Sequence, residues 1–254
     1  MIQLVATGVL NYLTQTDSSF EAGIGSWAGT NTSLSQSTAH VDDGSYSLLS
    51  TPAGAGATTA YTQQYAVLGN TQYTGIISDY AGLAASSVTC SIEWYSDTAG
   101  TVLISTSAGT PVTDSTSAWT QATVTAIAPS NAVSARLMFS YTASGVTDLK
   151  YLDECGLFLG TNTAWSIGCL GGSATATILR SDGLYVRNAS ASNVASLGLD
   201  QTITVNDYEV APGTTYTYQL QITGAGTSTS LVSPLSIGAS ASIATGRSLN
   251  AGAA

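Results

Sequence analysis

Few side chains of this 254-residue sequence could carry out acid–base, nucleophilic or metal chemistry. Its one histidine, His40, lies in residues 37–43 (STAHVDD), where a serine, a histidine and an aspartate occur close together. A catalytic triad depends on convergence in space, and residues this close along one strand cannot generally converge. The acid pairs 42–43 and 153–154 would point to opposite faces of a sheet, whereas a glycosidase needs two facing acids about 5–10 Å apart. No nucleophile elbow, H-E-x-x-H motif or P-loop is present, so the sequence predicts a protein that is not an enzyme.

The three cysteines, Cys90, Cys155 and Cys169, form neither a C-x-x-C pair nor a cluster with histidine. With a single histidine in the chain, the usual zinc ligand sets are nearly excluded. Each cysteine lies in a run of apolar or small residues, which predicts buried, inert thiols. One disulfide among the three remains open, because spacing alone does not settle it.

The charge balance excludes several kinds of partner. The chain has 5 Lys plus Arg against 15 Asp plus Glu, a net charge of −10, and only 8% of its residues are charged. So few basic residues cannot neutralise a nucleic-acid backbone or form a polybasic membrane contact. No run approaches the roughly 20 apolar residues that span a bilayer. The N-terminus lacks the basic residues of a signal peptide, so we expect any function outside a cell to be reached by another route, such as an assembled particle.

The elements that must position any functional residues are β-strands. Amphipathic helical spacing is almost absent, and Thr-rich runs alternate between apolar and polar residues, separated by Gly, Asn, Asp, Ser or Pro. The predicted strands of the first part are 45–50, 73–78, 88–95, 101–105, 119–127, 135–141 and 152–159. Strands at this spacing predict an antiparallel β-sandwich or jelly roll.

A second, smaller unit follows a boundary near residues 160–163. Its predicted strands are 174–180, 184–188, 202–205, 215–222 and 230–237, a number that suits a small Ig-like β-sandwich. The predicted fold class is therefore all-β, a jelly-roll sandwich over 11–159 followed by an Ig- or fibronectin-like sandwich over 163–237. Residues 1–10 are predicted to be an N-terminal assembly strand, and 238–254 a flexible tail or assembly arm.

The first unit resembles the jelly-roll carbohydrate-binding modules of xylanases and glucanases. Residues 11–27 (NYLTQTDSSFEAGIGSW) resemble the N-L-L-x-N-x-S-F-E-x-G-x-x-x-W opening of those modules. Further matching segments follow in the same order: 43–48 (DGSYSL), 70–74 (NTQYT), 119–124 (WTQATV) with 128–129 (AP), and 151–155 (YLDEC). The resemblance covers residues 11–159 and implies a module that binds polysaccharide without catalysis.

Residues 207–218 (DYEVAPGTTYTY) resemble the L-x-P-G-x-x-Y turn and strand of fibronectin type III domains. In those domains a tyrosine hydroxyl bonds back to the backbone upstream and fixes a corner of the sandwich. The resemblance assigns this structural role to Tyr216.

The order of the two units and the Ser/Thr/Ala-rich, charge-poor composition resemble minor tail and virion-surface proteins of actinobacterial tailed phages. This resemblance implies a non-catalytic structural protein of the virion surface, whose first module either contacts host-surface or cell-wall glycans or simply decorates the particle. The implied partners are other virion proteins and further copies of the chain, because assemblies of this kind have closed symmetry. The alternative is a secreted pair of carbohydrate-binding modules from a polysaccharide-degrading enzyme, against which the poor signal peptide counts. A host-coded adhesin meets the same objection.

The carbohydrate-binding resemblance also implies two kinds of site. Glu21 and Asp153 match positions that hold a structural Ca²⁺ in many such jelly rolls, and the alternative is that they only accept local hydrogen bonds. Sugars in such modules stack on exposed aromatic rings, for which the candidates are Tyr61, Tyr65, Trp94, Tyr95 and Tyr141. Alternation puts Trp94 and Tyr95 on opposite faces, so only one of them can contact a ligand. Trp27 and Trp119 match scaffold positions and are predicted to be core.

Overall fold

The computed structural model describes residues 2–7, 10–168, 175–187, 195–196, 199–200, 202–211, 214–224 and 227–233. Within these ranges the regular structure is almost entirely β, and the one α-helix is the short α1 (Gln15–Ser19). Thr14 caps this helix by accepting a hydrogen bond from the backbone N–H of Asp17 at 3.0 Å. None of the described helical structure has the length and apolar character needed to cross a membrane. The all-β prediction is confirmed.

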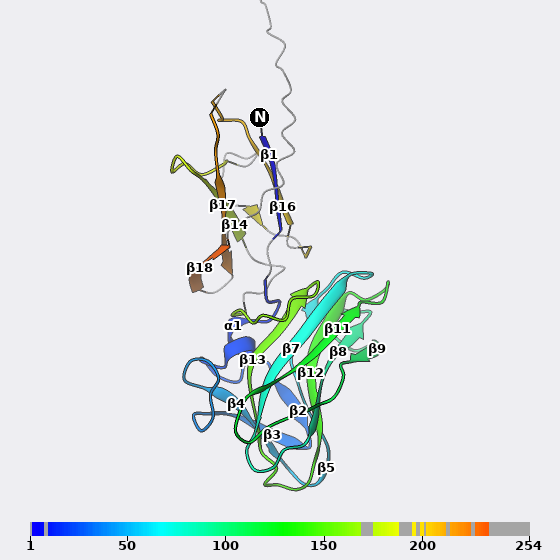
Figure 1. Cartoon of the computed structure of the whole chain (residues 1–254). Helices are drawn as coiled ribbons and strands as arrows, with labels where there is room; N and C mark the ends of the chain where they lie inside the picture. Colours follow the sequence, from blue (N-terminus) through cyan, green and yellow to red (C-terminus); the bar gives the residue numbers. More distant parts are fainter. Residues whose placement is uncertain are drawn as a thin grey trace, which may run out of the picture.

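Residues 10–168 form a jelly-roll sandwich of two antiparallel sheets (Figure 1). One sheet, the β8–β12 sheet, has the order β10 (Val112–Thr113), β8 (Ser87–Tyr95), β12 (Ser134–Ala143), β5 (Gly56–Tyr61) and β2 (Ala28–Thr30), with β6 (Tyr65–Ala66) and β9 (Leu103–Ala108) paired beside this path. The other, the β7–β13 sheet, has the order β11 (Thr120–Ile127), β7 (Gln72–Ala81), β13 (Lys150–Leu159), β4 (Ser47–Pro52) and β3 (Thr32–Ser37).

The core lies between these sheets, and strand alternation decides which side chains enter it. In β8, the side chains of Cys90, Ile92 and Trp94 belong to the core cluster, while the intervening residues point outward. In β12 the core-facing residues are Ala135, Leu137, Phe139, Tyr141 and Ala143. Burial of these apolar faces is the main favourable contribution to folding of the sandwich.

The central strands β7 and β13 are buried on both faces, because chain segments cover the outer face of their sheet. The His40 ring stacks on Tyr80, with ring centroids 4.1 Å apart, and lies edge-on to Tyr151 at 4.7 Å. At the other end, the Asn11 side chain donates to the carbonyls of Cys155 and Ser166 at 3.0 and 2.9 Å. His40 is therefore part of an aromatic cluster that holds a loop on the sheet.

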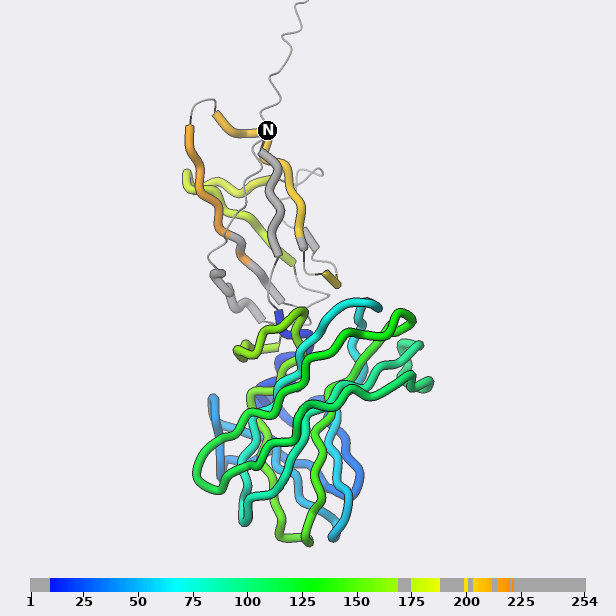
Figure 2. The backbone as a smooth tube through the Cα atoms, turned by 45° about the vertical axis from the view of Figure 1, so that its right-hand side comes forward, coloured from blue at the N-terminus to red at the C-terminus, as the bar shows by residue number. Residues whose placement is uncertain are grey.

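Two smaller sheets form the second unit. One is four-stranded, in the order β15 (Ala195–Ser196), β14 (Thr175–Arg180), β17 (Tyr218–Gly224) and β18 (Thr227–Ser233); the other pairs β1 (Ile2–Thr7) with β16 (Thr202–Asp207). Figure 1 shows β1 beside β16, before the chain enters the jelly roll. Figure 2 shows the later strands of the second unit, coloured yellow-green to orange, after the blue-to-green jelly roll. The predicted separation of residues 1–10 from the second unit is therefore corrected: all six residues of β1 pair in register with β16, so this strand belongs to the second unit. A role of β1 in assembly stays a prediction.

The predicted strands of the jelly roll are present, with boundaries that differ by a few residues. The missed strands β2, β3, β5, β6 and β10 are short or rich in Ser, Thr, Gly and Ala, so they carry little hydrophobic alternation. Cys90 and Cys155 are buried free thiols, and burial raises the pKa of both, as expected for inert thiols. Cys169 and the predicted tail, 238–254, lie outside the described residues.

Candidate functional site

The outer face of the β8–β12 sheet carries a cluster of aromatic and charged side chains, which we call the Arg136 cluster: Tyr61, Glu93, Tyr95 and Arg136. Strand alternation turns Glu93 and Tyr95 of β8 away from the core that Trp94 enters. Arg136 of β12 lies directly opposite Glu93 in the strand register. Tyr61 of β5 lies opposite Met138, which makes Arg136 its diagonal neighbour.

Hydrogen bonds and ring contacts fix these four side chains. The Arg136 Nε donates to Glu93 Oε2, which also accepts a 2.7 Å hydrogen bond from the Tyr95 hydroxyl. The Arg136 guanidinium carbon lies 3.9 Å from the centre of the Tyr61 ring and 5.6 Å from that of Tyr95. An arginine stacked on aromatic rings and paired with a carboxylate is preorganised, because its planar fork has little rotamer freedom left to lose.

The members of the cluster differ in how far they are buried, and burial changes the pKa of one of them. Tyr95 is only 4% exposed and Glu93 8%, whereas the Arg136 side chain is 21% exposed. Burial, together with the hydrogen bond to Glu93, raises the pKa of Tyr95 to about 12, so its hydroxyl keeps its proton and donates to Glu93. The guanidinium has five N–H groups, and one of them is used by Glu93. The cluster therefore presents the half-buried ring of Tyr61 beside N–H donors of Arg136, the combination that binds a ligand with both apolar faces and hydroxyl groups.

Of the five aromatic residues predicted to contact sugar, only Tyr61 and Tyr95 lie on this outer face, and because Tyr95 is covered, only the Tyr61 ring is accessible to a ligand. The other three are corrected to core positions. Trp94 is fully buried, and its indole N–H donates to Ser107 at 2.9 Å. Tyr65 is buried and donates to Asp17, and Tyr141 is buried beside Ser50 with its hydroxyl 3.3 Å from the serine oxygen. A ligand could reach these rings only if the sandwich opened.

Arg136 and Glu93 were not among the predicted site residues, although the sequence contains a signal for each of them. Glu93 has the same alternation phase as Tyr95, so it had to share the outer face with it. Arg136 is one of only five basic residues in the chain, and a basic residue within an otherwise uncharged strand is unusual in this sequence. Their pairing depends on strands 43 residues apart, which no local pattern reveals.

Glu21 and Asp153, the predicted calcium ligands, both hold one loop. Glu21 accepts hydrogen bonds from the backbone N–H of Ser45 and Tyr46 at 2.8 and 2.9 Å. A β-carbon on Gly44, whose φ is +76°, would lie 2.4 Å from the same carboxylate, so this contact requires glycine. Asp153 accepts from the N–H of Asp42 and Asp43 at 2.9 and 3.2 Å.

A β-bulge in β13 aims Asp153 at this loop. Glu154 has a φ of +46°, and the register with β7 shifts between Asp153 and Gly156. The extra residue lets Asp153 point outward while Cys155 points into the core, although the two would otherwise share a face. Burial raises the pKa of Asp153 to about 7, despite backbone donors that favour the charged form.

These residues do not fit a calcium ion in the arrangement that the structure shows. Both carboxylates already accept backbone N–H groups, which a cation would have to displace with carbonyl oxygens. Within the part of the chain that the structure describes, no three His, Cys, Asp or Glu side chains are placed to hold a metal ion. The geometry supports the local hydrogen-bond alternative, and calcium binding stays a prediction of the resemblance.

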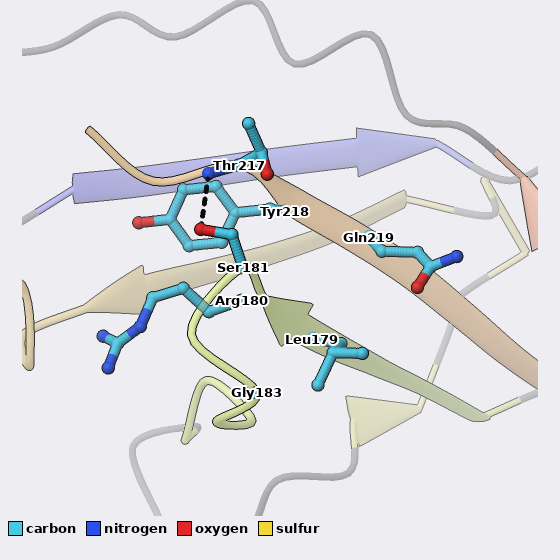
Figure 3. A pocket seen from close by; sticks show the side chains of 7 residues that line it. All are labelled: Leu179, Arg180, Ser181, Gly183, Thr217, Tyr218 and Gln219. Carbon is cyan, nitrogen blue, oxygen red and sulfur yellow. Dashed lines mark hydrogen bonds between the residues drawn. The ribbon is translucent and has the colours of Figure 1, made fainter.

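A pocket of about 270 Å³ lies in the second unit, between the end of β14 and the start of β17 (Figure 3). Its polar groups make structural contacts with one another. Ser181 Oγ accepts a hydrogen bond from the Thr217 N–H at 3.2 Å, and Arg180 forms ion pairs with Asp182 and Asp207. At the nearby corner the Tyr216 hydroxyl accepts from the Ala211 N–H at 3.2 Å, a backbone contact of the kind predicted for it. The pocket therefore offers a ligand no charged group that is free of structural contacts.

The comparisons with known proteins find similarity to solved structures alone. No protein-family profile matches the chain, and neither does any curated protein sequence. Among solved structures, the xylanase 10B CBM22-1–GH10 modules of Clostridium thermocellum, complexed with xylohexaose, are 15% identical over 60% of this chain, with a TM-score of 0.49. This chain spans only 29% of that protein.

Two further similar structures differ from each other in function. A xylan-binding domain of carbohydrate-binding module family 22 is 21% identical over 61% of this chain and 97% of its own, with a TM-score of 0.44. The Stig cyclase Fisc of Fischerella sp. TAU is 10% identical over 60% of this chain and 98% of its own, with a TM-score of 0.47. The strand order and the packing of the two sheets define the class, an all-β, jelly-roll protein. A fold alone does not specify a ligand.

Proposed function

We propose that this chain is a non-catalytic glycan-binding protein and that the Arg136 cluster is its glycan-binding face. The observation that carries the proposal is the arrangement of Arg136, stacked on Tyr61 and ion-paired with Glu93, on the outer face of a rigid sheet. Pyranose rings have apolar C–H faces and a rim of hydroxyls. An aromatic ring beside fixed N–H and carboxylate groups matches both features.

The non-catalytic part of the proposal is supported by what the candidate reactive groups contact. The His40 ring is stacked between aromatic neighbours, and Ser37 Oγ accepts a hydrogen bond from the Ala39 N–H at 3.1 Å. The Asp43 N–H binds Asp153. The serine, histidine and aspartate of this segment thus make contacts that stabilise the loop, and they do not form a proton relay with one another.

The test is binding of the full chain to an array of plant, bacterial and fungal polysaccharides, followed by titration calorimetry on any positive glycan. We expect binding that is lost in Arg136→Ala. Tyr208→Ala is the matched control, because Tyr208 is an exposed tyrosine of the second unit. Absence of binding to every polysaccharide at millimolar sugar, or equal binding by Arg136→Ala, would overturn the proposal.

We further propose that the protein works on the surface of a phage virion, as a minor tail or decoration protein present in several copies. Support comes from the sequence resemblance and from a surface made largely of Ser, Thr and Ala, which limits repulsion between neighbouring copies. The secreted pair of carbohydrate-binding modules is equally compatible with the fold. Cryo-electron microscopy of the parent particle distinguishes the two: density for this chain in symmetric copies supports the virion role, and its absence from purified particles contradicts it.

A further inference from the structure

A buried cluster of charges lies at one end of the jelly roll, inside the sandwich and apart from the Arg136 cluster. Its centre is Lys150, the single lysine of the sequence, whose side chain is fully buried. The Lys150 Nζ lies 2.6 Å from Asp114 Oδ2 and 3.4 Å from Asp148 Oδ1, and it donates to the Ala84 carbonyl at 3.3 Å. Burying an ammonium so completely costs several kcal/mol unless nearby groups offset it.

The strands hold the two closest members of this cluster in fixed positions. Lys150 begins β13, where it pairs with Ser50 on one side and Ala81 on the other. Asp114 follows β10, and two hydrogen bonds with Ser86 fix its position. The Asp114 N–H donates to the Ser86 carbonyl at 3.0 Å, and the Ser86 N–H donates to Asp114 Oδ1. An amine and a carboxyl group are therefore held in contact, which removes the entropic cost of bringing them together.

A third carboxyl, Asp79, completes the cluster. It lies on the core-facing side of β7, two residues before Ala81, and is fully buried. Neither of its oxygens receives a hydrogen bond from a donor in the described part of the chain. Asp79 lies opposite Leu152 in the register, two residues from Lys150 on the same strand. Burial, followed by the nearby charge of Asp114 and a hydrogen bond with it, raises the pKa of Asp79 well above its usual range, which favours the protonated acid. A neutral Asp79 can donate to Asp114, which explains how a third carboxyl is tolerated beside one ammonium.

We propose that Lys150 and Asp114 condense, without any enzyme, into an intramolecular amide (isopeptide) bond, with Asp79 as the proton relay. The site contains the parts that amide formation needs: an amine, a carboxyl group whose Oδ2 lies 2.6 Å from it, an N–H on the other carboxyl oxygen, and a second buried carboxyl, that of Asp79, which can relay protons. All four come from residues of this chain, and no cofactor is required.

The reaction balances with loss of one water. One proton moves from the Lys150 ammonium to Asp114 Oδ2, which leaves a neutral amine and a neutral carboxylic acid. The amine nitrogen attacks the carboxyl carbon, and the negative charge that develops on Oδ1 is stabilised by the Ser86 N–H. Asp79 gives its proton to Oδ2 and takes one from the nitrogen, so Oδ2 leaves as water and Asp79 returns to its original state. The product is a secondary amide between Nζ and the Asp114 carbonyl carbon.

Desolvation favours this product. Condensation replaces a fully buried ammonium and carboxylate with one neutral amide, and so removes the penalty of keeping two ions out of water. Asp148 is the competing carboxyl, but its Oδ1 lies farther from the amine, and its Oδ2 is held by the Ser144 N–H at 2.9 Å. The aromatic ring of Tyr141, whose centre is 5.5 Å from Nζ, covers the amine and excludes water that could compete as a nucleophile.

The test is the mass of the intact, purified full-length chain under denaturing conditions. We expect a mass lower by one water than the sequence requires, and a chymotryptic peptide pair joined through Lys150 and Asp114. The Lys150→Arg and Asp114→Ala variants should have their full sequence masses. Asp79→Asn, which keeps the shape of the relay but not its acid, should form the bond at least ten-fold more slowly or not at all.

A succinimide at an Asp-Gly pair also loses one water, so a second readout is needed. Because Lys150 is the only lysine, an amine-reactive reagent added to the denatured chain should label the N-terminus alone, and trypsin should not cleave after Lys150. The Arg187→Lys variant is the labelling control, since its exposed side chain should add one reactive amine. A full sequence mass in the folded wild type, a labelled Lys150, or a cross-link to Asp148 would each overturn the proposal. None of these readouts depends on glycan binding.

Discussion

The guanidinium of Arg136 lies 3.9 Å above the ring of Tyr61 and is held there by an ion pair with Glu93. Three strands that are separate in sequence, β5, β8 and β12, supply these side chains, and their antiparallel register makes the residues neighbours. Because the stack covers part of the Tyr61 ring, a ligand must contact the arginine and the exposed remainder of the tyrosine together. The two residues should therefore act as one unit in binding.

Substitution of either residue of this pair should weaken glycan binding. We expect Tyr61→Ala and Arg136→Ala each to lower affinity by about ten-fold, because each removes about 1–2 kcal/mol of stacking or hydrogen bonding. The double variant should lose little more than either single variant, which calorimetry measures as a coupling energy. Additive losses from the two single variants would show that the residues contact the ligand independently.

Trp94 should matter for stability and not through ligand contact. We expect Trp94→Ala to lower the free energy of unfolding by about 3–5 kcal/mol, because it leaves a cavity in the sandwich core. Tyr61→Ala, on the outer face, should cost much less. Urea denaturation of the two variants checks this difference; a Trp94 variant that is as stable as the wild type would contradict the core assignment.

The buried Asp153 should make stability depend on pH. Its pKa is raised from 3.8 to about 7 in the folded protein, so the folded state binds the proton more tightly than the unfolded chain does. The associated stability is complete below pH 3.8 and is lost as the pH rises through about 7, by at most about 4 kcal/mol. Denaturation curves across this range should therefore show a decline in the wild type that Asp153→Asn lacks. Parallel pH dependences in the two proteins would exclude Asp153 as the source.

Removal of calcium should not change the melting temperature. Glu21 and Asp153 already accept backbone N–H groups of the 42–46 loop, so the loop is held without a cation. Thermal melts in EDTA and in excess Ca²⁺ should therefore coincide. A rise of several degrees with Ca²⁺ that Glu21→Gln abolishes would instead support the calcium ligands that the resemblance implies.

Much of the architecture follows from local pattern. Alternation in residues 88–95 predicted a strand with Trp94 and Tyr95 on opposite faces, and the structure confirms this arrangement. Weakly patterned strands such as β2 and β3 were missed, because Ser, Thr and Gly residues do not show which face is buried. The β-bulge in β13 was also missed. A register shift depends on the partner strand, and glutamate is not a residue type from which a positive φ would be predicted.

By itself, the sequence determined the all-β class and the alternation that separates neighbouring side chains. Only the tertiary structure decided which of the candidate tyrosines are accessible, that β1 completes the second unit, and which charges meet. Glu93 and Arg136 are 43 residues apart, and Asp114 and Lys150 are 36 apart. The physical reason is that antiparallel pairing brings distant strands together through a register set by the packing of the whole core, so contacts across strands are not encoded in any local stretch of the chain.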